Sequence, residues 1–146
     1  MSRIRPVTVD EYLQIIEIAK EIHAQKAEPI PSFHNSKKHE LESCLQTPFT
    51  GFGGKLFYKG FIHKASMLFY LLARNHVMAN GNKRLACLCL SYFCFINNRF
   101  LVIPENVFYD LAKETVLASE EDKDTTILKI EKTVLKYITV LPKHLR

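Results

Sequence analysis

The sequence contains no apolar stretch long enough to cross a bilayer and no apolar segment near its start that would suit a secretory signal. Its longest apolar runs, residues 65–73 and 85–96, both fall short of the roughly 20 residues that a membrane helix needs. Charged residues interrupt the chain from Val9 to Lys26, directly after Arg3 and Arg5. These absences predict a cytoplasmic protein with no membrane partner.

The four cysteines lack the spacing of metal ligands. Cys87, Cys89 and Cys94 fall within one predicted helix, where a Cys-x-Cys pair places its two thiols on different sides. Cys44 has no neighbouring thiol in the sequence. We therefore expect buried free thiols rather than zinc ligands or disulfides.

The charged residues are spread over the chain without a basic stripe interleaved with aromatic residues. The 20 Lys and Arg residues outnumber the 15 Asp and Glu residues, which gives a formal net charge of +5. A positive charge favours anionic partners in general. Because no nucleic-acid motif accompanies it, an acidic protein or a nucleotide explains the charge better than a nucleic acid does.

The length of 146 residues and the 47% hydrophobic content predict one globular domain, residues 1–146, without internal repeats. Thr8 and Glu11 have the spacing of a capping box at a helix start. His34 and His39 are expected at the surface, and His23 on the packed face of the first helix. The last helix is expected to bury Ile127, Leu128, Val134, Leu135 and Ile138. Helices are predicted at about 8–26, 37–46, 61–75, 82–96, 105–117 and 125–140, with an irregular hairpin at 47–58 and an extended link at 101–104.

The stretch from His76 to Arg84 lies between the two apolar runs. Each run predicts a helix, and the last residues of this stretch form the start of the second helix. A helix start presents unpaired N–H groups and the positive end of the helix dipole, which together attract anions. Lys83 and Arg84 oppose that dipole, so helix stability alone does not explain them. A bound polyphosphate would explain them, and His76 has an unperturbed pKa suited to proton transfer near neutrality.

This stretch resembles the core motif of the Fic/Doc family, and more closely that of its Doc (death-on-curing) branch. His76, Gly81, Asn82, Lys83 and Arg84 match the family pattern, in which Lys in place of a second Gly is the Doc-like choice. Two positions depart from it: Met78 replaces a usual Phe, and Asn80 replaces a usual acid. Further landmarks, which extend the resemblance over about residues 40–118, are Leu41–Ser43, Phe52–Gly54, Lys64, Asn75 and Asn97–Asn98.

The resemblance implies an all-α bundle with a small β-hairpin flap beside the active loop. It implies that His76 is a general base, that Lys83 joins it in catalysis, and that Asn80 occupies the position of the Mg²⁺ ligand. The expected nucleotide-binding residues are Gly81, Asn82, Lys83 and Arg84. The expected target-binding flap comprises Phe52, Gly53, Gly54 and Lys55.

The activity implied for a Doc-like protein is transfer of the γ-phosphate of ATP, with Mg²⁺, to a hydroxyl of a target protein. By resemblance the target is translation elongation factor Tu, and the enzyme acts as a toxin. The self-inhibitory motif of some Fic proteins has no match here, which favours an inhibitor on a second protein, an antitoxin. Because Asn80 supplies no carboxylate, two alternatives stay open: a catalytically silent protein that binds a nucleotide or partner, and an AMP transferase.

Overall fold

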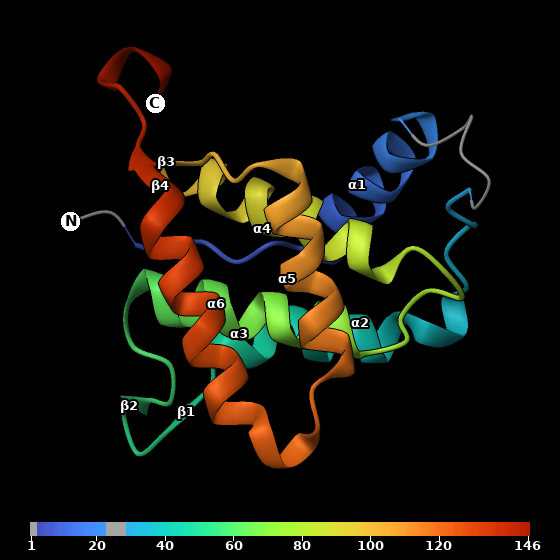
Figure 1. Cartoon of the computed structure of the whole chain (residues 1–146), viewed down its shortest axis with the longest axis horizontal. Helices are drawn as coiled ribbons and strands as arrows, with labels where there is room; N and C mark the ends of the chain where they lie inside the picture. Colours follow the sequence, from blue (N-terminus) through green and yellow to red (C-terminus); the bar gives the residue numbers. More distant parts are fainter. Residues whose placement is uncertain (1–2, 23–28) are drawn as a thin grey trace.

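The computed structural model describes residues 3–22 and 29–146, and α-helices dominate it (Figure 1). The helices are α1 (Val9–Ile22), α2 (Lys38–Gln46), α3 (Gly60–Arg74), α4 (Asn82–Ile96), α5 (Glu105–Leu117) and α6 (Lys123–Tyr137). Short 3₁₀ turns are η1 (Asn35–Lys37), η2 (Thr47–Phe49), η3 (Glu120–Asp122) and η4 (Lys143–Leu145). Two antiparallel pairs complete the chain: β1 (Gly51–Phe52) with β2 (Lys55–Leu56), and β3 (Arg99–Leu101) with β4 (Ile138–Val140). The expected all-α bundle with a small hairpin is confirmed.

Helix α4 is the centre of the bundle, because it packs against α1, α3 and α5. Its sequence is apolar on several sides, as a helix surrounded by others requires. The helix ends where Asn98 adopts a left-handed conformation with φ of 62°, as the Asn97–Asn98 pair predicts. Its buried residues are Leu85, Ala86, Cys89, Leu90, Phe93 and Cys94.

The end of the chain differs from the prediction, which continues the last helix to Val140. Helix α6 ends at Tyr137, and residues 138–140 form β4 against β3. Residues 138–140 include the β-branched residues that favour strands, and a partner strand far away in the sequence decides their conformation. The predicted link at 101–104 therefore overlaps a strand instead of being only a connection.

The apolar face predicted for the last helix is also partly wrong. Ile127, Ile130 and Val134 are buried at helical spacing, whereas Leu128 and Leu135 are 49% and 59% exposed. The buried stripe is narrower than the sequence suggests, because only one side of α6 faces the bundle.

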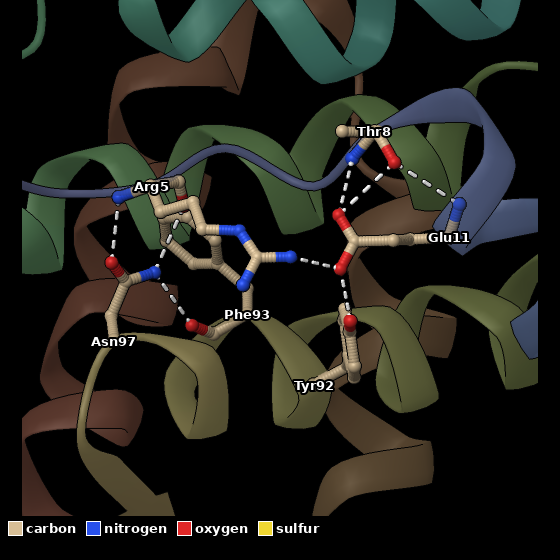
Figure 2. A network of polar contacts seen from close by, with 6 residues as sticks. All are labelled: Arg5, Thr8, Glu11, Tyr92, Phe93 and Asn97. Atoms are coloured by element: carbon tan, nitrogen blue, oxygen red, sulfur yellow. Dashed lines mark hydrogen bonds and ion pairs between the residues drawn. The ribbon is translucent and has the colours of Figure 1, made fainter. Parts of the chain in front are cut away.

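The start of α1 confirms the predicted capping box (Figure 2). The Glu11 amide donates to Thr8 Oγ1 at 3.1 Å, and the Thr8 amide donates to Glu11 Oε1 at 3.1 Å. These reciprocal bonds satisfy two donors that the helix start leaves unpaired. The predicted continuation to Lys26, and His23 with it, lies outside the described residues.

The segment before α1 is tied to α4 by a polar network (Figure 2). Asn97 Oδ1 accepts from the Arg5 amide at 2.7 Å, and Asn97 Nδ2 donates to the Arg5 carbonyl at 3.0 Å. Glu11 accepts hydrogen bonds from Tyr92 and from the Arg5 guanidinium. Burial opposes ionisation of Glu11, but the bonds from Tyr92, Thr8 and Arg5 outweigh it, so the pKa of this carboxyl lies below its usual value. The charged form of Glu11 thus joins α1 to α4.

The thiols lie in or next to the core: Cys44, Cys89 and Cys94 are buried, and Cys87 is half-buried. Burial raises the pKa of Cys44 to about 11. A thiol that stays protonated at neutral pH is a poor metal ligand and a poor nucleophile.

In the described part of the chain, no helix combines the length and apolar character needed to cross a membrane.

Candidate active site

Gly81 occupies the point where the polar loop after α3 turns into α4. It is the N-cap of α4, with φ of 86° and ψ of 8°, in the left-handed region that glycine tolerates best. The first helical bond runs from the Leu85 amide to the Gly81 carbonyl at 2.9 Å. The amides of residues 82–84 therefore have no acceptor within the helix, and no side chain caps it. This leaves the helix start available to an anion.

The surroundings of Gly81 leave little room for a larger residue. A Cβ atom at this position would lie 3.2 Å from Ile30 Cδ1 and 3.5 Å from Arg84 Nη2. Since the positive φ adds strain for any other L-residue, the backbone conformation favours glycine here, and a Cβ atom would also require the Ile30 side chain to shift by a few tenths of an ångström. The same geometry brings the Arg84 guanidinium close to the helix start.

The loop between the two helices, residues 76–81, is held by asparagine side chains. Asn82 Oδ1 accepts from the Met78 amide at 3.0 Å, and Asn82 Nδ2 donates to the Met78 carbonyl at 2.9 Å. Met78 itself is buried, so its side chain anchors the loop to the core. Asn82 thus fixes the shape of the loop, a function that sequence analysis missed. Its expected contact with phosphate oxygens stays a prediction.

His76 is exposed and lies two residues after the end of α3. The end of α3 is clamped by Arg74, whose guanidinium donates to the carbonyl oxygens of Thr115 at 3.0 Å and of Ala118. The same guanidinium pairs with Glu120 at 3.0 Å. Because these bonds satisfy the end of α5, they fix α3 and α5 to each other close to His76.

His76 opens onto a pocket of about 480 Å³ with a mixed polar and apolar lining, which we call the His76 pocket. One wall is formed by residues 76–79 of the loop, and the other by Ser32, His34, Ser36 and Lys37. His34 lies at the surface, as predicted, but nothing in the sequence connects its segment to the loop. No sequence spacing could reveal the pairing, because some forty residues separate the two walls and only packing brings them together.

Arg84 does not line the His76 pocket. It lies at a larger hollow of about 760 Å³ between α4 and α5, whose apolar wall includes Leu88, Phe108 and Tyr109. Lys83, its neighbour in the first turn, is half-buried. The predicted residues are therefore gathered at one helix start, but His76 and Arg84 face two different hollows.

The model of the Fic/DOC family matches residues 7–94, more than half of the chain, and the match includes the entire loop. This chain belongs to the Fic/Doc family. Neither a search of curated proteins nor a search of solved structures finds a match. The matched residues include His76 and the segment from Gly81 to Arg84.

Magnesium does not fit the donor atoms of this Fic/Doc loop. Asn80 offers a neutral amide, and its Oδ1 already accepts a hydrogen bond from the Gly81 amide at 2.8 Å. Within residues 3–22 and 29–146, no three His, Cys, Asp or Glu side chains lie close enough to hold a metal ion. Since Mg²⁺ prefers anionic oxygens, the neutral amide of Asn80 is a weaker ligand than a carboxylate at this position would be.

The hairpin forms as predicted, but its expected position beside the active loop is wrong. It directly precedes α3, whereas the loop follows α3, and Figure 1 places the two at opposite ends of that helix. Helix α3 has 15 residues, which corresponds to about 22 Å at the usual rise. The buried Lys64 donates to the Tyr58 carbonyl, and burial lowers the pKa of its amine. This bond anchors the hairpin to the start of α3, away from His76.

Proposed function

We propose that this Fic/Doc protein is a transferase that moves the γ-phosphate of ATP to a hydroxyl of a target protein. The observation that carries the proposal is the geometry of the helix start. The left-handed Gly81 leaves the amides of residues 82–84 without helical acceptors, and two cations follow it. On the same loop, His76 lines a pocket whose other wall is polar. Phosphoryl transfer depends mainly on positioning and electrostatic stabilisation, which such a site supplies.

In the proposed reaction, His76 accepts the proton of the target hydroxyl. The hydroxyl oxygen forms a bond to the γ-phosphorus, and the bond between that phosphorus and the β–γ bridging oxygen breaks. ADP leaves with the electron pair of the broken bond. The N–H groups at the start of α4 and Lys83 hold the phosphates of the donor, and the Arg84 guanidinium, which lies close to the helix start, adds positive charge there.

Lys83 favours γ-phosphate transfer over AMP transfer, because the resemblance to Doc rests partly on this residue. By the same resemblance we propose elongation factor Tu as the target and a separate antitoxin protein as the inhibitor. The net charge of +5 suits both an acidic antitoxin and a nucleotide. We propose no protein ligand for magnesium, which would have to be held by the phosphates of ATP.

A second candidate function is a silent member of the family that binds nucleotide without transferring a group. Two observations favour it: the amide oxygens of Asn80 and Asn82 are both bonded to loop backbone, and the loop contains no carboxylate. Such a loop could bind phosphate through N–H groups and cations alone. This candidate and the transferase differ in whether a phosphate group of ATP is transferred to a protein.

Labelled ATP decides between these functions. We expect that the protein, incubated with a bacterial lysate, Mg²⁺ and ATP labelled at the γ-phosphate, transfers label to a protein band, and that ATP labelled at the α-phosphate gives none. The lysate alone and the protein alone serve as controls. Label from the α-phosphate would mean AMP transfer, and ATP binding without label from either position would favour the silent protein.

A further inference from the structure

The His76 pocket has a second wall that belongs to no predicted site. The 32–37 segment, which leads into α2, contributes Ser32, His34, Ser36 and Lys37 opposite residues 76–79. All four side chains are polar, and one of them is a cation. A polar, positively charged wall facing a histidine suits an anionic ligand.

This wall is held in place from two sides. Ile30, just before the segment, is buried and packs close to Gly81: a Cβ atom built at Gly81 would lie only 3.2 Å from Ile30 Cδ1. From α1, Lys20 Nζ donates to Ser32 Oγ at 2.8 Å. The segment is therefore positioned against the loop by packing on one side and by a hydrogen bond on the other.

The histidine of this wall has a defined tautomer in its neutral form. The Ser36 amide donates to His34 Nδ1 at 3.2 Å, and Ser36 Oγ lies 2.6 Å from the same nitrogen. Because Nδ1 accepts, the proton of the neutral ring is assigned to Nε2. His34 therefore offers an N–H donor from Nε2, whereas His76 serves as the acceptor of a proton in the proposed reaction.

Lys37 is the cation of the His76 pocket, since Arg84 lines the other hollow. Its only charged partner in the described residues is Glu40, with Nζ and Oε1 3.4 Å apart and both side chains more than a third exposed. Exposed ion pairs contribute little to stability. An arriving phosphate can therefore recruit the Lys37 ammonium without unfolding anything.

We propose that Lys37, together with the Nε2–H of His34, binds the terminal phosphate of the nucleotide donor on the side of His76. This inference rests on the proposed function and adds two residues to it. The start of α4 holds the rest of the polyphosphate, and the 32–37 segment closes the site over the group to be transferred. Lys37 then offsets the negative charge next to the attacking hydroxyl.

Lys37→Ala is expected to raise the Kd for ATP by about fivefold to tenfold, because it removes a charge-assisted hydrogen bond. The affinity for ADP, which lacks the γ-phosphate, should change by less than about twofold. Lys37→Arg should retain most of the ATP affinity, and Lys38→Ala is the matched control on the exposed start of α2. Isothermal titration calorimetry measures all four proteins with both nucleotides, and thermal unfolding checks that each is folded.

Equal loss of ATP and ADP affinity, or no loss of either in Lys37→Ala, would overturn the inference and leave the proposed function standing. An unchanged ATP affinity with a raised KM for the target would also overturn it, because Lys37 would then serve the target. If the wild type binds no ATP, the proposed function fails by itself. In that case, tripolyphosphate is titrated into the wild-type protein, and the NMR signals of the His34 and His76 rings are recorded. Shifts of both signals would support an anion site between the two rings, and unchanged signals would refute it.

Discussion

Replacing His76 by alanine is expected to lower transfer of the γ-phosphate by about 100-fold to 10,000-fold, the usual contribution of a general base. The Kd for ATP should stay within about twofold, since the imidazole acts on the hydroxyl and not on the phosphates. Transfer is measured with γ-labelled ATP and the modified target, and binding by calorimetry.

The matched control is His144→Ala, which removes an exposed histidine from η4, close to the last residue of the chain. His144→Ala should leave both the transfer of the γ-phosphate and the Kd for ATP unchanged. Transfer that survives in His76→Ala would show that another group accepts the proton. A large loss of ATP binding in the same variant would instead assign His76 to the nucleotide.

Asn80→Asp is expected to have the second largest effect, and in the direction of gain. The substitution is nearly isosteric, so the acceptor bonded to the Gly81 amide is kept while one negative charge is added. That charge lies close to the start of α4 and its two cations, where it is favourable. The carboxylate also supplies the anionic oxygen that magnesium needs and the native amide lacks.

We expect ATP binding to Asn80→Asp to become about tenfold tighter with Mg²⁺, or about 1.4 kcal/mol, with a rise in transfer of similar size. Without Mg²⁺ the gain should vanish. Gln14→Glu, which adds the same charge on an exposed face of α1, controls for net charge. If Asn80→Asp shows neither metal dependence nor faster transfer, position 80 is not a lost metal site in this protein.

The local parts of the fold followed from the sequence because short-range chemistry determines them. The boundaries of α4 and α5 agree with the prediction, since Asn82 follows a helix-breaking glycine and Pro104 precedes Glu105. The capping box at Thr8 was likewise readable from two residues. Each of these features depends on neighbours within one turn.

The parts that were missed depend on contacts between distant segments. Strand β4 pairs with β3 across almost forty residues, and this distant pairing, rather than a continuation of α6, determines the conformation of its β-branched residues. The exposure of Leu128 and Leu135 depends on which side of α6 meets the bundle. Hydrophobic periodicity gives the width of an apolar face only approximately.

The site shows the same division. His76 and the residues from Gly81 to Arg84 were identified by their order along the chain. The wall containing His34 and Lys37 was not, because the fold alone brings it to His76. The family resemblance predicts a hairpin beside the loop, whereas the length of α3 separates the two in this chain.

The central claim, that the start of α4 binds the phosphates of a nucleotide, is tested most directly by calorimetric titration of ATP into Lys83→Ala and Arg84→Ala. Each variant removes one cation from the first turn while keeping the loop and Gly81, and Lys132→Ala on the exposed face of α6 is the control. The account predicts a Kd raised by about fivefold or more in both loop variants, as expected when a charge-assisted contact to phosphate is lost, and an unchanged Kd in the control. Wild-type affinity in both loop variants would contradict it.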